Sequence, residues 1–165
     1  MAVFSFLGIS CGDDGGGYEY NVITQGDEKV SVEYAGAKTE NYQVAKATYT
    51  HLYQRVEGSA KIDSSDGVTF HVTFSDGKGY YPYWQFQTRD KIINGVKLSI
   101  NGIFFGMDYA RYTDKAEGDA VVKSFNGKKI TLSFNNLKFD RYIEISSDKK
   151  QKITINGDIT FTFDE

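Results

Sequence analysis

Alternation of apolar and polar residues predicts β-strands along most of this chain. In the segment from Val68 to Phe74 every second residue is large and apolar, and threonines and His71 occupy the positions between them. This period of two is typical of a strand with one buried face. Turn-forming residues recur between such segments, which favours antiparallel strands joined by short connections.

The C-terminal segment keeps one phase of alternation over a long stretch. Its apolar residues all occupy odd positions, and Gly157 lies between them: Ile153, Ile155, Ile159, Phe161 and Phe163. We therefore predict one strand over 152–163, with Gly157 at a bulge or at a close approach of another backbone. Leu137, Phe139, Ile143 and Ile145 predict a separate strand before it, followed by a polar loop at 146–151. The chain from Val121 onward is thus predicted to be a meander of four strands.

Asn126-Gly127 is predicted to be the turn of a hairpin that spans 121–134. These two residues tolerate the positive φ angles of a two-residue type I′ turn. Such a turn pairs Val121 with Leu132 and Lys123 with Ile130 on one face. The other face then carries Ala120, Ser124, Thr131 and Ser133.

Two segments also fit a helix. Apolar residues at helical spacing lie within 40–57, and this segment also contains Thr48-Tyr49-Thr50-His51-Leu52-Tyr53, whose residues favour a strand. We favour the strand. A short helix is a second alternative at Asp108 to Ala116.

These patterns predict an all-β fold: an antiparallel β-sandwich or partly closed barrel of about eight to ten strands, with at most one or two short helices. The chain has 165 residues, with 12 Tyr, 12 Phe and one Trp, which suits a single β domain over 18–165 and excludes a disordered chain. Its 19 Lys and Arg are balanced by 22 Asp and Glu. Without a basic surface, nucleic acid is not an expected partner.

The N-terminal residues predict where the protein is located in the cell. Met1 to Ser10 carries no charge and has the length of the apolar part of a signal peptide, and Cys11 follows it. We expect 1–10 to act as a signal-peptide-like segment and 11–17 as a lipid anchor and flexible tether. The alternative is a first strand over Val3 to Ile9 with a buried Cys11. A lone cysteine excludes an internal disulfide and a zinc site built on several thiolates.

Three features together give a resemblance to a known group of proteins. Small residues precede Cys11 as in a lipobox, and Gly12-Asp13-Asp14 resembles the export signal of Bacteroidetes lipoproteins. The C-terminal strands VVKSFNGKKITLSF, LKFDRYIEI and ITINGDITFTF are similar to those of small Bacteroidetes surface lipoproteins of uncharacterised function. The resemblance implies a lipid-anchored protein on the outer membrane surface, whose body lies in the extracellular or periplasmic space. It implies no catalytic residues.

The sequence contains no arrangement typical of a catalytic or metal site. No GxSxG elbow is present, His51 has no carboxylate next to it in the sequence, and His71 is expected on the polar face of a strand. Asp63-Ser64-Ser65-Asp66-Gly67 has oxygen ligands for calcium but lacks the spacing and final Glu of an EF-hand, so a polar turn is preferred. We expect no cofactor and no bound metal. Asp63, Asp66, Asp76 and Asp90 are the carboxylates that a glycosidase would need.

The most distinctive segment is Tyr80-Tyr81-Pro82-Tyr83-Trp84-Gln85-Phe86-Gln87. As a strand it buries Tyr80, Pro82, Trp84 and Phe86 and presents Tyr81, Tyr83, Gln85 and Gln87 to solvent. Tyrosine rings flanked by amides suit a sugar-binding surface, although tyrosine is also simply a good strand former. Pro82 lacks a backbone donor, which predicts a strand that is at an edge or bulged.

Three functions remain after these considerations. The leading hypothesis is a non-catalytic envelope lipoprotein that binds a glycan or protein partner or serves in assembly. The alternative is a carbohydrate-binding module that uses residues 80–87, and a hydrolase is the third.

Overall fold

The computed structural model describes residues 28–51, 54–56, 59–61, 67–75, 82–106, 112–144 and 146–164, with backbone alone at 54–56 and 59–61. This part of the chain contains strands and no helix, which confirms the predicted all-β class. The strands are β1 (Lys29–Tyr34), β2 (Lys38–His51), β3 (Gln54–Val56), β4 (Ser59–Lys61), β5 (Val68–Ser75), β6 (Tyr83–Thr88), β7 (Asn101–Gly106), β8 (Glu117–Phe125), β9 (Lys129–Tyr142) and β10 (Lys150–Phe163).

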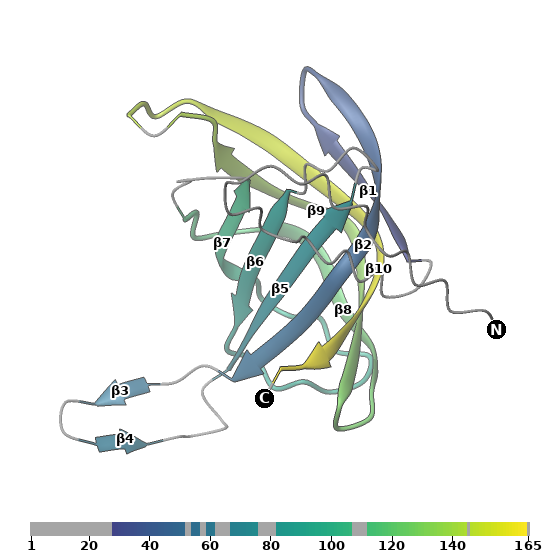
Figure 1. Cartoon of the computed structure of the whole chain (residues 1–165), viewed down its shortest axis with the longest axis vertical. Helices are drawn as coiled ribbons and strands as arrows, with labels where there is room; N and C mark the ends of the chain where they lie inside the picture. Colours follow the sequence, from purple (N-terminus) through teal and green to yellow (C-terminus); the bar gives the residue numbers. More distant parts are fainter. Residues whose placement is uncertain are drawn as a thin grey trace, which may run out of the picture.

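Eight strands form one curled sheet with the shape of a half-barrel (Figure 1). Their order is β7-β6-β5-β2-β1-β10-β9-β8, and each pair of neighbours in this order is antiparallel. Strands β3 and β4 pair with each other and extend away from the sheet. The curled sheet encloses its apolar face and leaves the other face on the outside.

Aromatic side chains fill the enclosed side of the sheet. Trp84 is fully buried, and its ring lies 4.4 Å from that of Phe86 and 5.1 Å from that of Phe134, measured between centroids. Phe70, Phe74, Phe105, Phe139 and Phe161 continue this cluster. Burial of these rings stabilises the folded sheet.

Irregular segments of the chain cover the two edge strands, β7 and β8. Residues 95–98 follow the β8 edge: Leu98 N donates to Ala120 O at 2.7 Å, and Val122 N donates to Val96 O at 3.0 Å. On the β7 edge, Ile103 and Thr113 exchange two backbone hydrogen bonds of 2.7 Å. These contacts satisfy backbone groups that an open edge would leave available for pairing with another chain.

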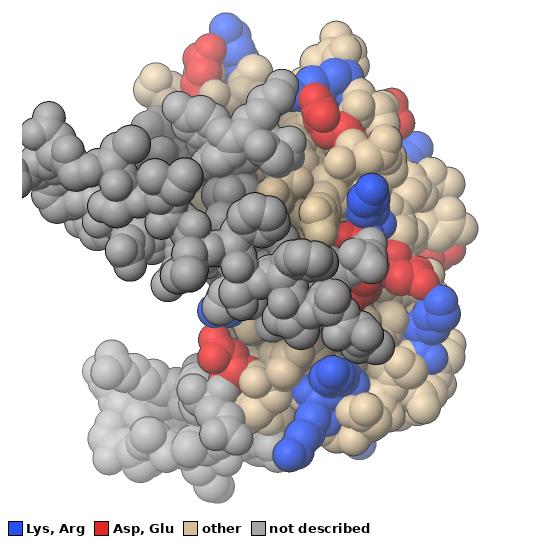
Figure 2. Space-filling view, turned by 45° about the vertical axis from the view of Figure 1, so that its right-hand side comes forward, with Lys and Arg blue, Asp and Glu red and all other residues tan. Residues whose placement is uncertain are grey.

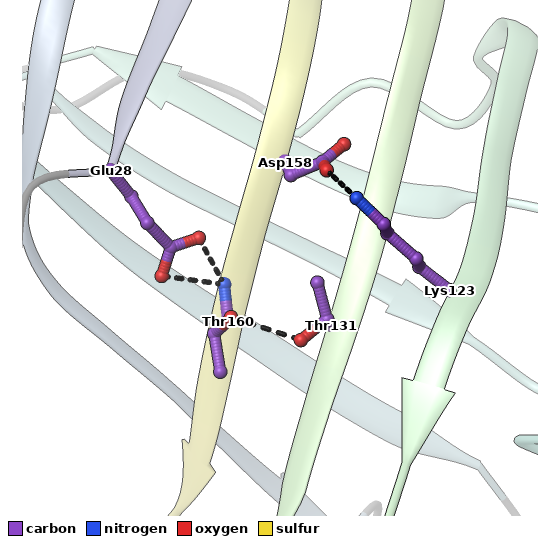
Figure 3. Close-up of polar contacts among 5 residues, drawn as sticks. All are labelled: Glu28, Lys123, Thr131, Asp158 and Thr160. Carbon is purple, nitrogen blue, oxygen red and sulfur yellow. Dashed lines mark hydrogen bonds and ion pairs between the residues drawn. The ribbon is translucent and has the colours of Figure 1, made fainter.

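Glu28 supports the sheet where β1 begins. Its backbone carbonyl accepts a hydrogen bond from Val44 N at 3.0 Å, and its carboxylate accepts one from Thr160 N at 2.9 Å (Figure 3). Beyond this point β2 and β10 pair directly and in parallel, with Thr162 opposite Thr48. Glu28 thus joins the two strands on either side of β1 where they converge, β2 through its backbone carbonyl and β10 through its carboxylate.

The preferred strand over 40–57 is confirmed for β2, as far as His51. A β-bulge between Val44 and Lys46 explains why the segment also fits a helix. Tyr42 and Val44 are buried before the bulge and Ala47 and Tyr49 after it, so the buried positions change parity. Of the second helical alternative, Asp108 to Ala116, the described residues 112–116 are not helical, and the rest lies outside the described chain.

The long C-terminal strand is confirmed, but the predicted four-strand meander is wrong. Residues 129–142 form one strand, β9, so three strands follow residue 116. Asn135 and Asn136 lie opposite the single residue Asn156, whose Oδ1 accepts a hydrogen bond from Asn136 N at 2.8 Å. This bulge shifts the buried positions of β9 from even to odd, and the sequence pattern therefore resembled two strands.

The predicted register of the 121–134 hairpin is also wrong. Val122, not Val121, lies opposite Leu132, and a bulge at Lys123 places Phe125 opposite Ile130. Asn126 does not have the positive φ of a type I′ turn; its Oδ1 accepts hydrogen bonds from Lys128 N and Lys129 N instead. The bulge places Lys123 on the outside, so its ammonium group stays out of the apolar core.

Candidate functional site

The predicted alternation of residues 82–87 is confirmed. Pro82, Trp84 and Phe86 are buried, while Tyr83, Gln85 and Gln87 are half-buried on the outer face of the sheet. Tyr80 and Tyr81 lie outside the described residues. Three of the four predicted binding residues, Tyr83, Gln85 and Gln87, therefore lie side by side on an outer surface.

Of the two alternatives predicted from Pro82, the edge is wrong, whereas the pairing of this strand with β7 does contain a register shift, between Gln85 and Gln87. Strand β6 lies between β5 and β7, and β7 is the edge. Pro82 immediately precedes the strand, and its carbonyl accepts a hydrogen bond from Phe74 N at 3.1 Å. Pro82, which has no backbone N–H, thus stands just before the first residue of the strand. A proline is tolerated there, as it is on an edge strand, because no hydrogen bond between strands is lost.

Strand register places the outward residues of three strands in a compact group, which we call the neutral face. Tyr83 lies opposite Thr73, Gln85 opposite His71 and Gln87 opposite Thr69 on β5. On the other side, Gln85 lies opposite Phe104 and Gln87 opposite Asn101 on β7. The neutral face comprises His71, Thr73, Tyr83, Gln85, Gln87, Asn101 and Phe104, together with Thr69, whose side chain is buried.

Charge distinguishes the neutral face from the rest of the outer surface. Strands β5, β6 and β7 contain no Lys, Arg, Asp or Glu. On the opposite half, ion pairs join Lys123 Nζ to Asp158 Oδ2 at 2.6 Å (Figure 3) and Lys152 Nζ to Asp140 Oδ1 at 3.1 Å. The right-hand side of Figure 1, turned forward in Figure 2, shows charges of both signs interspersed.

Three aromatic rings extend across the neutral face to the covered edge, and we call them the aromatic row. The ring centroids of Tyr83 and Phe104 lie 5.9 Å apart, and those of Phe104 and Tyr112 lie 5.7 Å apart. Successive rings are tilted by 59° and 52°. Tyr112 is 57% exposed, so the row ends in solvent.

Sequence reasoning did not identify Phe104 and Tyr112 as members of this surface. Phe104 and Phe105 are adjacent and chemically identical, and only the pairing of β7 with β6 shows that Phe104 points outward. Tyr112 lies in a segment for which a helix was an alternative. The local pattern therefore contained no signal that joins either ring to Tyr83.

A hydrogen-bond chain fixes the hydroxyl group of Tyr83. His71 Nδ1 is bonded to Tyr83 Oη, which donates to Gln85 Oε1 at 3.3 Å. Because the hydroxyl has one proton, directed to an oxygen that can only accept, Nδ1 is the donor to Tyr83. His71, predicted as an exposed residue, is thus half-buried and engaged with its neighbour.

Partial burial shifts the protonation of both partners toward the neutral form. Desolvation lowers the pKa of His71, opposed by the negative charge of Asp164 and assisted by Lys46. Desolvation also raises the pKa of Tyr83, with a smaller contribution from Tyr112. At neutral pH the chain therefore consists of uncharged groups.

Among the other sequence candidates, His51 does not join this site. His51 packs against Phe163, with 5.3 Å between ring centroids. Cys11 and residues 62–66 of the loop considered for calcium lie outside the described chain. Among the described residues there is no group of three or more His, Cys, Asp or Glu side chains that could hold a metal, and no helix there is long and apolar enough to cross a membrane.

Comparison with known proteins adds no family to this description. No protein-family model, no curated protein and no solved structure matches the chain.

Proposed function

We propose that this protein is a non-catalytic binding module of the cell envelope, and that its neutral face is the binding surface. The observation that carries the proposal is the aromatic row, set on a part of the outer surface whose strands contain no charged residue. The aromatic rings of the core lie inside the curled sheet, where burial stabilises the fold, whereas the three rings of the aromatic row lie on its outer side.

The rings are arranged to meet a partner with little loss of conformational entropy. Tyr83 and Phe104 are held on paired strands, and the Tyr83 hydroxyl is fixed by His71 and Gln85. Rigid aromatic side chains with two rotatable bonds provide large contact area at low entropic cost. An exposed group of rings that is already ordered is therefore better suited to recognition than to packing alone.

Footprinting by hydroxyl radicals tests whether the neutral face is a binding surface. We expect a solubilised cell-envelope fraction to reduce the oxidation of Tyr112 by several fold. Phe125 is exposed at the end of β8, on the half of the sheet that carries the ion pairs and that we call the charged half. It serves as the internal control, because its oxidation should not change. Equal protection of both residues, or of neither, would contradict the proposal.

The proposal includes a lipid anchor at Cys11, which is supported by the apolar segment before it and by the tether after it. Replacing Cys11 with Ala in the full precursor removes the thiol that would be acylated. We expect this variant to move from the membrane fraction to the soluble fraction. Ser10→Ala, which keeps a small residue before the cysteine, is the matched control and should stay with the membrane. A membrane-bound Cys11→Ala variant would show that no anchor forms at this residue.

A further inference from the structure

Unpaired amide groups lie beside the aromatic row on the neutral face. Gln87 and Asn101 are opposite each other across β6 and β7, and neither side chain makes a hydrogen bond within the described part of the chain. Gly102 makes room for this arrangement, because a Cβ atom there would lie 2.9 Å from Gln87 Oε1. Each amide offers both a donor and an acceptor to a ligand.

The surroundings of these amides select against a charged ligand. No cation on β5, β6 or β7 is available to pair with a phosphate, sulfate or carboxylate, and no anion is available to pair with an amine. Charged side chains border the neutral face on its β2 side, where Lys46 lies opposite Thr73 and Asp164 acts on His71. On the β6 and β7 side, around Gln87 and Asn101, these strands offer a ligand amides, hydroxyls and ring faces.

We infer that the neutral face binds a neutral carbohydrate chain. Tyr83, Phe104 and Tyr112 would stack on the C–H faces of sugar rings, and the amides of Gln85, Gln87 and Asn101 would hydrogen-bond their hydroxyl groups. Aromatic rings with polar neighbours suit a ligand that is apolar on its faces and polar at its rim. This inference rests on the proposed function and specifies the class of ligand.

The tilt between successive rings adds a geometric requirement. Neighbouring rings in the row differ in orientation by 59° and 52°, so a flat ligand cannot stack on all three. A chain of separate sugar rings, each free to rotate about its glycosidic bonds, can present one face to each aromatic ring. An oligosaccharide is therefore favoured over a single planar molecule.

Affinity electrophoresis in gels containing a neutral polysaccharide tests the inference. The probes are mixed-linkage β-glucan, xylan, galactomannan and amylopectin, with polygalacturonate as the acidic comparison. We expect at least one neutral polysaccharide to retard the protein and polygalacturonate to leave its migration unchanged. Tyr112→Ala should weaken the retardation about tenfold, since one stacked ring is lost.

Two further variants separate stacking from a change in folding. Tyr112→Phe keeps the ring and should retain binding within about twofold of the original protein. Phe125→Ala removes an exposed ring from the charged half and should bind as the original protein does. Equal weakening by Phe125→Ala and Tyr112→Ala would overturn the assignment to the neutral face.

The outcomes also distinguish this inference from the proposed function. If no neutral polysaccharide retards the protein while the envelope fraction still protects Tyr112, the ligand is not a carbohydrate and the binding face stands. If polygalacturonate alone retards it, the inference of a neutral ligand is wrong. If neither retardation nor protection occurs, both proposals fail.

Discussion

Replacing Trp84 with Ala is expected to lower the free energy of unfolding by about 3–5 kcal/mol, the usual cost of deleting a large buried ring. Trp84 is fully buried at the centre of the aromatic core. Its ring lies within 6.3 Å of four phenylalanine rings, between centroids: Phe74, Phe86, Phe134 and Phe139. These rings come from both halves of the curled sheet, so the cavity left by the indole cannot be filled by a shift of one strand.

Trp84→Phe should cost less than Trp84→Ala for a specific reason. The indole Nε1 has no hydrogen-bond partner among the described residues, so phenylalanine removes a buried polar group along with part of the ring. Gln85→Ala, at the next position on the same strand but on the outer face, is the control. Equilibrium unfolding in urea, followed by circular dichroism, measures all three variants. Similar midpoints for Trp84→Ala and Gln85→Ala would contradict the assignment of Trp84 to the core.

Alternation predicted strands well where a strand runs without interruption on one buried face. In β5, Val68, Phe70, Val72 and Phe74 are all buried, as their spacing indicates. In β10, Ile153 and Ile155 before Gly157 and Ile159 and Phe161 after it are all buried, because the extra residue of the bulge is on β9. Alternation of apolar and polar residues is a reliable signal in such segments, because successive side chains of a strand point to opposite faces of the sheet.

Bulges account for the wrong four-strand meander, for the wrong hairpin register and for the helical alternative in β2, where the favoured strand is confirmed. Near Ala45 in β2, Asn135-Asn136 in β9 and Lys123 in β8, an inserted residue reverses which positions face the core. The sequence then resembles a helix, a turn or a different register, although the strand continues. Since a bulge depends on the partner strand as much as on its own residues, local pattern reading cannot place it.

The candidate site was predictable in part for the same reason. The outward positions of Tyr83, Gln85 and Gln87 follow from the alternation within β6 alone. Phe104 and Tyr112 join them through contacts between β6, β7 and the segment at 112–116, which the sequence does not encode locally. The absence of charge in β5, β6 and β7 is visible in the sequence, but it becomes a surface property only once these strands are neighbours.

Replacing Gly118 with Ala is expected to lower the free energy of unfolding by about 2–5 kcal/mol. One part is steric: a Cβ atom at Gly118 would lie 2.0 Å from the carbonyl oxygen of Asn136, so the backbone must move, at an overpacking cost of about 1–3 kcal/mol. The other part is conformational, because Gly118 has a φ of +91°, where a side chain costs about 1–2 kcal/mol. Thermal or urea unfolding of the variant measures the sum.

Gly127→Ala separates the two contributions. Gly127 has a similar φ of +88°, but a Cβ atom there would meet nothing within 4 Å. Its substitution should therefore cost the conformational part alone, and the difference between the two variants should report the contact with Asn136. Gly118 faces the bulge at Asn135-Asn136, which in turn faces Asn156 beside Gly157. If Gly118→Ala were no more costly than Gly127→Ala, β8 and β9 would not approach this closely at Asn136.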